Sequence, residues 1–86
     1  MQPLKSQLYG YGGELYEISD QDVAGAVQYF GYLNIIGKWI IQKIDTGAAP
    51  QTVRYVSGPA STYPASWSGR ASLTYGYYNT ITNPVP

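Results

Sequence analysis

Residues 28–45, with the sequence QYFGYLNIIGKWIIQKID, constrain the fold more than any other part of the chain. They contain two runs of aromatic and branched residues without proline, which favours extended strands. Between the runs, Asn34 and Gly37 tolerate the positive φ angles that close a tight reversal. The stretch therefore predicts a β-hairpin, with one strand at 28–33 and the other at 38–45.

The second strand of this hairpin is apolar on both faces where it begins. Trp39 and Ile41 point to one side, and Ile40 and Ile44 point to the other. A strand of this kind is usually covered on both faces. A chain of 86 residues buries only about 60–65% of its unfolded surface, and without cysteine it has no disulfide to stabilise it. We therefore expect a neighbouring subunit to cover part of this strand.

The composition also favours association with other protein chains. Only 12% of the residues are charged, whereas about 25% is typical of globular proteins. The ten tyrosines combine a large apolar ring with a polar tip, which suits surfaces that become covered on binding. Because the formal net charge is zero, little electrostatic repulsion opposes contact between copies.

Three further segments show the pattern of strands. Residues 15–18 predict a short strand, followed by a turn at Ser19 and Asp20, whose side chains bond nearby backbone amides. Residues 52–57 alternate between two faces and predict a third strand, antiparallel to the second strand of the hairpin. Residues 70–78 have the most regular alternation in the chain and predict a fourth strand.

Together these segments predict a small all-β domain over residues 14–78, with a three- to four-stranded antiparallel sheet and an extended arm at each end. Residues 79–86 form the C-terminal tail, and the glycine-rich residues 1–13 form the N-terminal arm. The N-terminal arm is either a tail without fixed structure or a segment that docks on a neighbouring subunit. In the second case, four apolar residues of the arm make the contact: Leu4, Leu8, Tyr9 and Tyr11.

Residues 59–69 are rich in proline, serine and alanine, which indicates a crossing segment instead of a strand. A single helical turn over 64–70 is an alternative, because proline suits the first position of a helix. We expect Trp67 to fold back onto the sheet. We also expect Arg70 to stack on Trp67 and to bond backbone carbonyl groups, which gives both residues a structural role.

Charge is distributed unevenly along the chain. Residues 1–22 hold one lysine and four acids, a net charge of −3, whereas residues 38–70 hold four bases and one acid, a net charge of +3. Such poles either favour head-to-tail stacking of identical subunits or meet within one chain.

Residues for catalysis and ligand binding are scarce. Histidine and cysteine are absent, and no glycine-rich phosphate-binding motif is present, so we expect no enzyme. Asp20 and Asp22 have the spacing of two calcium ligands, but the remaining ligands are missing, so we expect no metal and no cofactor. Five basic residues and a pI of about 6.0 argue against nucleic acid. No apolar run reaches the roughly 18 residues of a membrane-spanning helix, so we expect no membrane contact.

Four short patterns, all within residues 28–78, together resemble a group of short proteins of tailed bacteriophages. They are Tyr29-Phe30-Gly31-Tyr32, Gly37-x-Trp39-Ile40-Ile41, Arg54-Tyr55-x-x-Gly58 and Trp67-x-x-Arg70-Ala71-x-Leu73-x-Tyr75. The resemblance implies a small β-rich component of the virion, in the tail, fibre, baseplate or capsid surface. It also implies assembly in the host cytoplasm, and it brings no catalytic residue.

The predicted function is therefore structural: a virion subunit that binds other protein subunits, either copies of itself or capsid and tail proteins. The alternative is a carbohydrate- or receptor-binding module, because exposed tyrosine and tryptophan rings stack on sugars. The candidate interface residues are Leu8, Tyr9, Tyr11, Trp39, Tyr75, Tyr77 and Tyr78.

Overall fold

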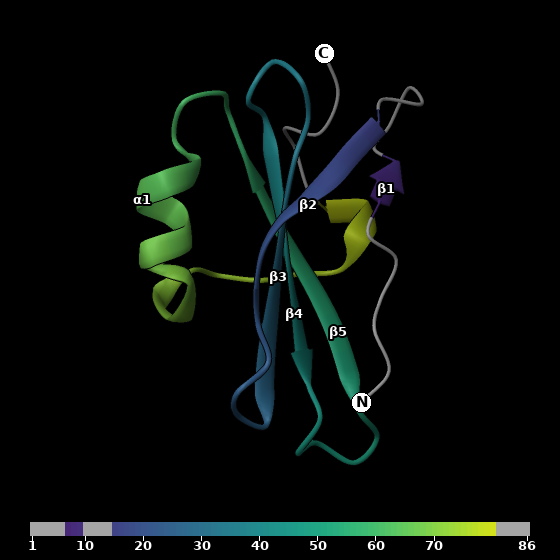
Figure 1. Cartoon of the computed structure of the whole chain (residues 1–86). Helices are drawn as coiled ribbons and strands as arrows, with labels where there is room; N and C mark the ends of the chain where they lie inside the picture. The colour runs from purple at the N-terminus through teal and green to yellow at the C-terminus, as the bar shows by residue number, and fades with distance from the viewer. Residues whose placement is uncertain (1–6, 10–14, 81–86) are drawn as a thin grey trace.

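The computed structural model describes residues 7–9 and 15–80 of the chain. It contains one antiparallel sheet in which the strand order follows the chain order (Figure 1). The strands are β1 (Gln7–Tyr9), β2 (Leu15–Asp22), β3 (Val27–Leu33), β4 (Trp39–Asp45) and β5 (Thr52–Gly58). Three short helices follow: α1 (Tyr63–Ser68), η2 (Arg70–Ser72) and η3 (Tyr78–Thr80). The expected all-β fold is confirmed, with four long strands and the three-residue β1.

The predicted central hairpin is present. Strand β3 pairs with β4 along its whole length, from Val27 opposite Asp45 to Leu33 opposite Trp39. Gly37 has a φ angle of 92°, which explains the need for glycine at the end of the turn. The third strand, β5, pairs with β4 in the expected antiparallel register.

Strand β2 is longer than predicted, and the expected turn at Ser19 and Asp20 is wrong. The strand continues to Asp22, but its register with β3 shifts between Ile18 and Asp20, which is the mark of a β-bulge. Ile18 lies opposite Tyr32, whereas Asp20 lies opposite Gly31. Because paired residues share a face, the bulge places Asp20 and Asp22 on the opposite face from Ile18.

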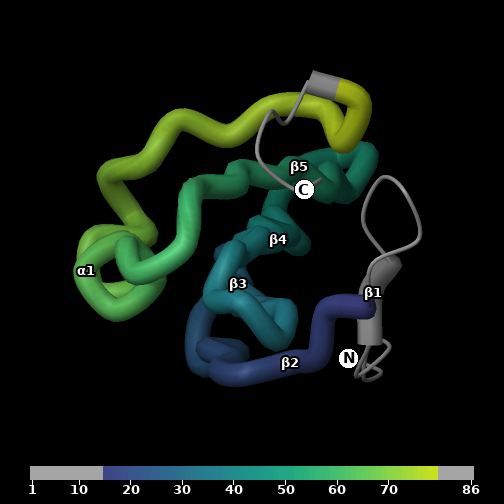
Figure 2. The backbone as a smooth tube through the Cα atoms, turned by 90° about the horizontal axis from the view of Figure 1, so that it is seen from above, coloured from purple at the N-terminus to yellow at the C-terminus, as the bar shows by residue number. Residues whose placement is uncertain are grey.

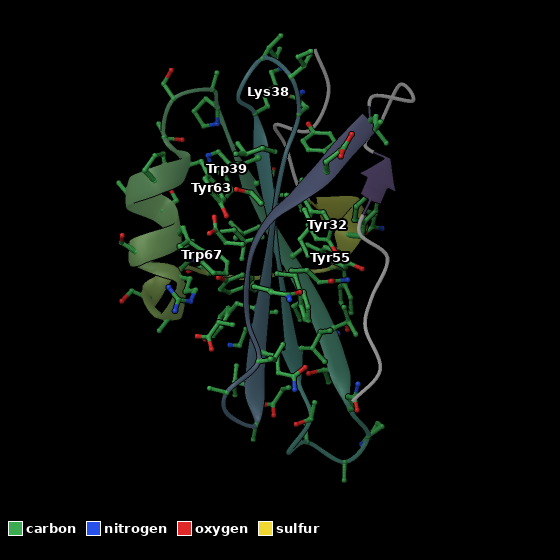
Figure 3. The ribbon with its side chains drawn as sticks, viewed as in Figure 1. Tyr32, Lys38, Trp39, Tyr55, Tyr63 and Trp67 are labelled. Atoms are coloured by element: carbon green, nitrogen blue, oxygen red, sulfur yellow. The ribbon has the colours of Figure 1, made fainter. Side chains whose placement is uncertain are left out.

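The two faces of the sheet carry two separate hydrophobic clusters. The sheet is curled, and α1 lies against its outer face (Figure 2). Tyr32 and Tyr55 point to the inner face, while Trp39, Tyr63 and Trp67 gather on the α1 side (Figure 3). The inner cluster has as its buried members Tyr16, Phe30, Tyr32, Ile40 and Ile44. The outer cluster has as its buried members Trp39, Ile41 and Tyr63, packed against Leu33, Trp67, Leu73 and Tyr75 among others.

Strand β4 is covered on both faces by its own chain, so the prediction that a neighbouring subunit covers it is wrong. Trp39 is only 4% exposed, and Ile40 and Ile41 are fully buried. The cover on the outer face comes from α1, which forms at the position of the predicted helical turn. Its flanking Thr62 accepts a hydrogen bond of 2.7 Å from the indole Nε1–H of Trp39.

Residues 70–78 do not form the predicted fourth strand. Within residues 73–80, the chain makes one bridge to the sheet, in which Tyr55 and Gly76 exchange backbone hydrogen bonds of 2.7 and 2.9 Å. Leu73 packs with the outer cluster, whereas Tyr78 packs with the inner one. The segment therefore passes around the edge of β5, and its apolar residues serve two faces instead of one.

The close contact between α1 and β3 depends on a glycine. A Cβ atom at Gly31 would overlap the hydroxyl of Tyr63 and touch the ring of Trp67. We expect Gly31→Ala to reduce the free energy of unfolding by about 1–3 kcal/mol, because α1 must move away from the sheet. Chemical denaturation measures this change.

Gly25→Ala is the matched control, because a Cβ atom at Gly25 would meet nothing within 4 Å. We expect the control to unfold at the same denaturant concentration as the natural chain. Equal stability of the two variants would contradict the close packing of α1 on β3.

Candidate protein interface

The most exposed large aliphatic residues of the described chain lie in the turn between β3 and β4. Ile35 is fully exposed and Ile36 is 56% exposed. Turns usually carry polar residues or glycine at such positions. Burial of an isoleucine side chain contributes about 1.5–3 kcal/mol, so neither residue adds this amount to the stability of the isolated chain. A pair of exposed isoleucines at one turn is therefore a candidate for contact with another molecule.

The turn is held in one conformation by Asn34. This residue is 8% exposed, and its Oδ1 accepts hydrogen bonds from the backbone N–H groups of Ile36, at 3.1 Å, and Lys38, at 2.9 Å. Its own backbone N–H donates to the carbonyl of Lys38 at 2.9 Å. The isoleucines are therefore presented on an ordered backbone, which lowers the entropy lost on binding.

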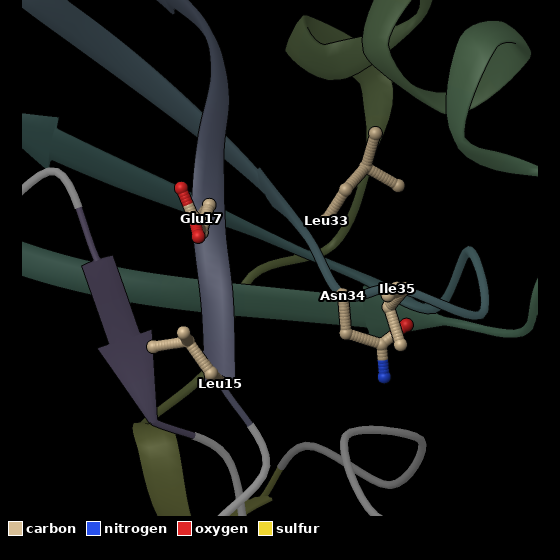
Figure 4. A pocket seen from close by; sticks show the side chains of 5 residues that line it. All are labelled: Leu15, Glu17, Leu33, Asn34 and Ile35. Carbon is tan, nitrogen blue, oxygen red and sulfur yellow. The ribbon is translucent and has the colours of Figure 1, made fainter.

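A groove of about 590 Å³ lies beside the turn, lined by Leu15, Glu17, Leu33, Asn34 and Ile35 (Figure 4). It opens where β2 and β3 separate. Strand β2 pairs with β3 only up to Glu17 opposite Leu33, and from there it pairs with β1. We define the turn surface as the residues that line the groove together with Ile36.

The predicted interface residues lie elsewhere, and most are not free for contact. Trp39 is buried, which excludes it from the surface. Tyr75 is half-buried, with its ring 6.1 Å from that of Tyr29, and Tyr78 is half-buried against Tyr55. Tyr77 alone among these four is exposed, at 63%.

The remaining predicted contacts are in the N-terminal arm. The backbone of Leu8 and Tyr9 belongs to β1, which pairs with β2 of the same sheet. Leu4 and Tyr11 lie outside the described residues, as do residues 81–86 of the predicted tail. Sequence reasoning missed the turn surface, although two adjacent isoleucines between Asn34 and Gly37 were a visible signal.

The contacts predicted for Arg70, stacking on Trp67 and a bond to a backbone carbonyl, are present in the structure. The Arg70 guanidinium lies 4.4 Å from the Trp67 ring, and its Nη1 donates to the Trp67 carbonyl at 2.8 Å. In addition, its Nη2 donates to Oδ2 of Asp22 at 2.8 Å. The hydrogen bond from Arg70 holds the pKa of Asp22 below its usual value, with a second contribution from the Ala24 backbone N–H. We call this arrangement the Arg70 clasp.

A second carboxylate of β2 has a similar role. The hydroxyl of Tyr63 donates to Oδ2 of Asp20 at 2.7 Å, and burial, followed by this bond, raises the pKa of the Tyr63 hydroxyl. Two of the acids in residues 1–22 therefore contact the segment after β5. In these pairs, the acidic region (1–22) and the basic region (38–70) meet within one chain.

Among the residues that the structure describes, no group of three potential metal ligands exists. None of the helices described is long and apolar enough to cross a membrane.

Comparisons of the chain with known protein families, with curated proteins and with solved structures give no match.

The Arg70 clasp is expected to stabilise the fold without taking part in binding. Arg70→Ala removes the stacked guanidinium and the bond to the Trp67 carbonyl, and loss of about 1 kcal/mol shifts the melting temperature of so small a domain by about 4–8 °C. We expect a decrease of this size in thermal denaturation followed by circular dichroism. An unchanged melting temperature would remove the structural role of Arg70.

The clasp also predicts the response to acid. Because the pKa of Asp22 is lowered in the folded state, its contribution is complete above the ordinary value of 3.8 and is lost as the pH falls further. We expect Asp22→Asn to lower the melting temperature at neutral pH. Between about pH 5 and pH 3, the melting temperature of this variant should fall less steeply than that of the natural chain. Parallel curves for the two proteins would contradict the clasp.

Proposed function

We propose that the protein is a structural subunit of a larger protein assembly and that it binds its neighbours through the turn surface. The observation that supports this most directly is the fully exposed Ile35 beside the partly exposed Ile36, on a turn fixed by Asn34 and next to an apolar groove. Because the backbone of the turn is already ordered, burial of these side chains in a contact costs less conformational entropy than burial from a flexible loop.

The core of the domain gives a second reason for this assignment. Both hydrophobic clusters are closed by the chain itself, so the isoleucines of the turn are not a remnant of an incomplete core. Low charge and zero net charge favour contact over repulsion. A virus particle is the assembly that we propose, and the resemblance of residues 28–78 to short phage proteins supports this choice.

Carbohydrate binding is less well supported by the geometry. Sugar stacking needs free aromatic faces, but the Lys43 Nζ lies 5.3 Å from the centre of the Tyr75 ring. Likewise, the Arg54 guanidinium lies 4.5 Å from the centre of the exposed Tyr77 ring. Each of these cations already occupies one face of its ring within the chain. The apolar turn surface therefore remains the better candidate for the contact.

Sedimentation of the chain from the cell that produces it tests this function. A tagged natural chain should move with a fast-sedimenting fraction that contains nuclease-resistant nucleic acid, as expected for a virus particle. We expect the double variant Ile35→Ser, Ile36→Ser to shift to the slow fraction, because each substitution removes apolar area from the contact.

Val23→Ser is the matched control for this experiment. Val23 is 50% exposed and lies in the loop between β2 and β3, at the other end of β3 from the turn. The control should stay with the fast fraction. A natural chain found only in the slow fraction, or a double variant that sediments like the natural chain, would contradict the proposed function.

A further inference from the structure

The turn surface contains a projecting part and a hollow part side by side. The exposed Ile35 and Ile36 form the projection. Leu15 and Leu33 contribute apolar lining to the groove (Figure 4). A surface that carries both shapes can match itself after a two-fold rotation, because each copy then offers its projection to the groove of the other. This is the geometry of an isologous dimer.

We propose that the turn surface binds a second copy of this chain across a two-fold axis, an inference that rests on the proposed function. In this contact, Ile35 and Ile36 of each copy enter the groove of the other. The groove, at about 590 Å³, has room for two aliphatic side chains. The turn need not rearrange, since Asn34 already fixes its backbone.

The charges near the surface agree with the exchange of turns. Glu17 is exposed and lines the groove, and Lys38 lies at the end of the turn (Figure 3). A two-fold exchange moves the lysine of each copy toward the carboxylate of the other. Unlike charges at the edge of an apolar contact favour the correct register and suppress contacts between like charges. The zero net charge of the chain adds no repulsion between the copies.

The size of the surface indicates how strong the contact is. Six residues on each side form an interface well below the roughly 800 Å² per partner of a standard complex. The purified dimer is therefore weak. In an assembly, where other contacts raise the effective concentration, a weak two-fold contact becomes fully occupied.

Analytical ultracentrifugation of the purified full chain, from micromolar to millimolar concentration, tests the dimer. We expect the average mass to rise toward twice that of the chain. Ile36→Ser should weaken the dimerisation constant by about a hundredfold, because each of the two copies loses the apolar contribution of one side chain, worth about tenfold apiece. The control Val23→Ser should dimerise like the natural chain.

Cross-linking locates the contact independently of its strength. The chain has no native cysteine, so Ile36→Cys and Val23→Cys each provide one reactive thiol of similar exposure. With a short bis-maleimide, we expect the chain with cysteine at 36 to form covalent dimers many times faster. Circular dichroism confirms that each variant is folded.

A chain that stays monomeric at every concentration, with equal cross-linking rates at the two sites, would overturn the two-fold contact. A dimer that Ile36→Ser leaves unchanged would also overturn it. Either result would leave the proposed function intact if the isoleucines are still needed for entry into the fast-sedimenting fraction, because the neighbour would then be a different protein.

Discussion

Burial of β4 on both faces is the constraint on which the rest of the structure depends. Trp39 and Ile41 need one cover, and Ile40 and Ile44 need another, in a chain of only 86 residues. The chain meets this need by curling the sheet around the inner cluster and by folding α1 onto the outer face (Figure 2). Apolar burial on two faces then replaces the disulfides or metals on which small domains often depend.

The outer cover stays in place because β2 changes face at its bulge. The shift between Ile18 and Asp20 turns two carboxylates toward α1 and η2, where they meet Tyr63 and Arg70. Without the bulge, the regular alternation of β2 would direct these carboxylates into the inner cluster. One irregular residue pair therefore joins the edge of the sheet to the segment that covers it. With both faces covered, the two adjacent isoleucines of the turn, Ile35 and Ile36, stay exposed at the surface of the described part of the chain.

The parts of the fold that could be predicted are those in which local preference and tertiary packing agree. The hairpin and β5 combine β-forming residues with suitable turn residues. Trp67 and Arg70 are close in the sequence and stack on each other. Residues 70–78 alternate as a strand does, but they form none, because their apolar side chains pack on both faces of the sheet around the edge of β5. The tyrosines were predicted to lie in an interface, but in this chain many tyrosine rings pack against one another. The groove could not be predicted, since it forms where the pairing of β2 with β3 ends at Glu17 and β2 continues alongside β1.

Amide hydrogen exchange of β4, measured at several protein concentrations, tests the central claim most directly. If the chain covers β4 by itself, the amides of Ile40, Ile41 and Ile44 should be among the slowest to exchange, and their protection should be the same in dilute and concentrated solution. Protection that appears only as the concentration rises would show that other copies supply the cover, and it would contradict a self-contained core.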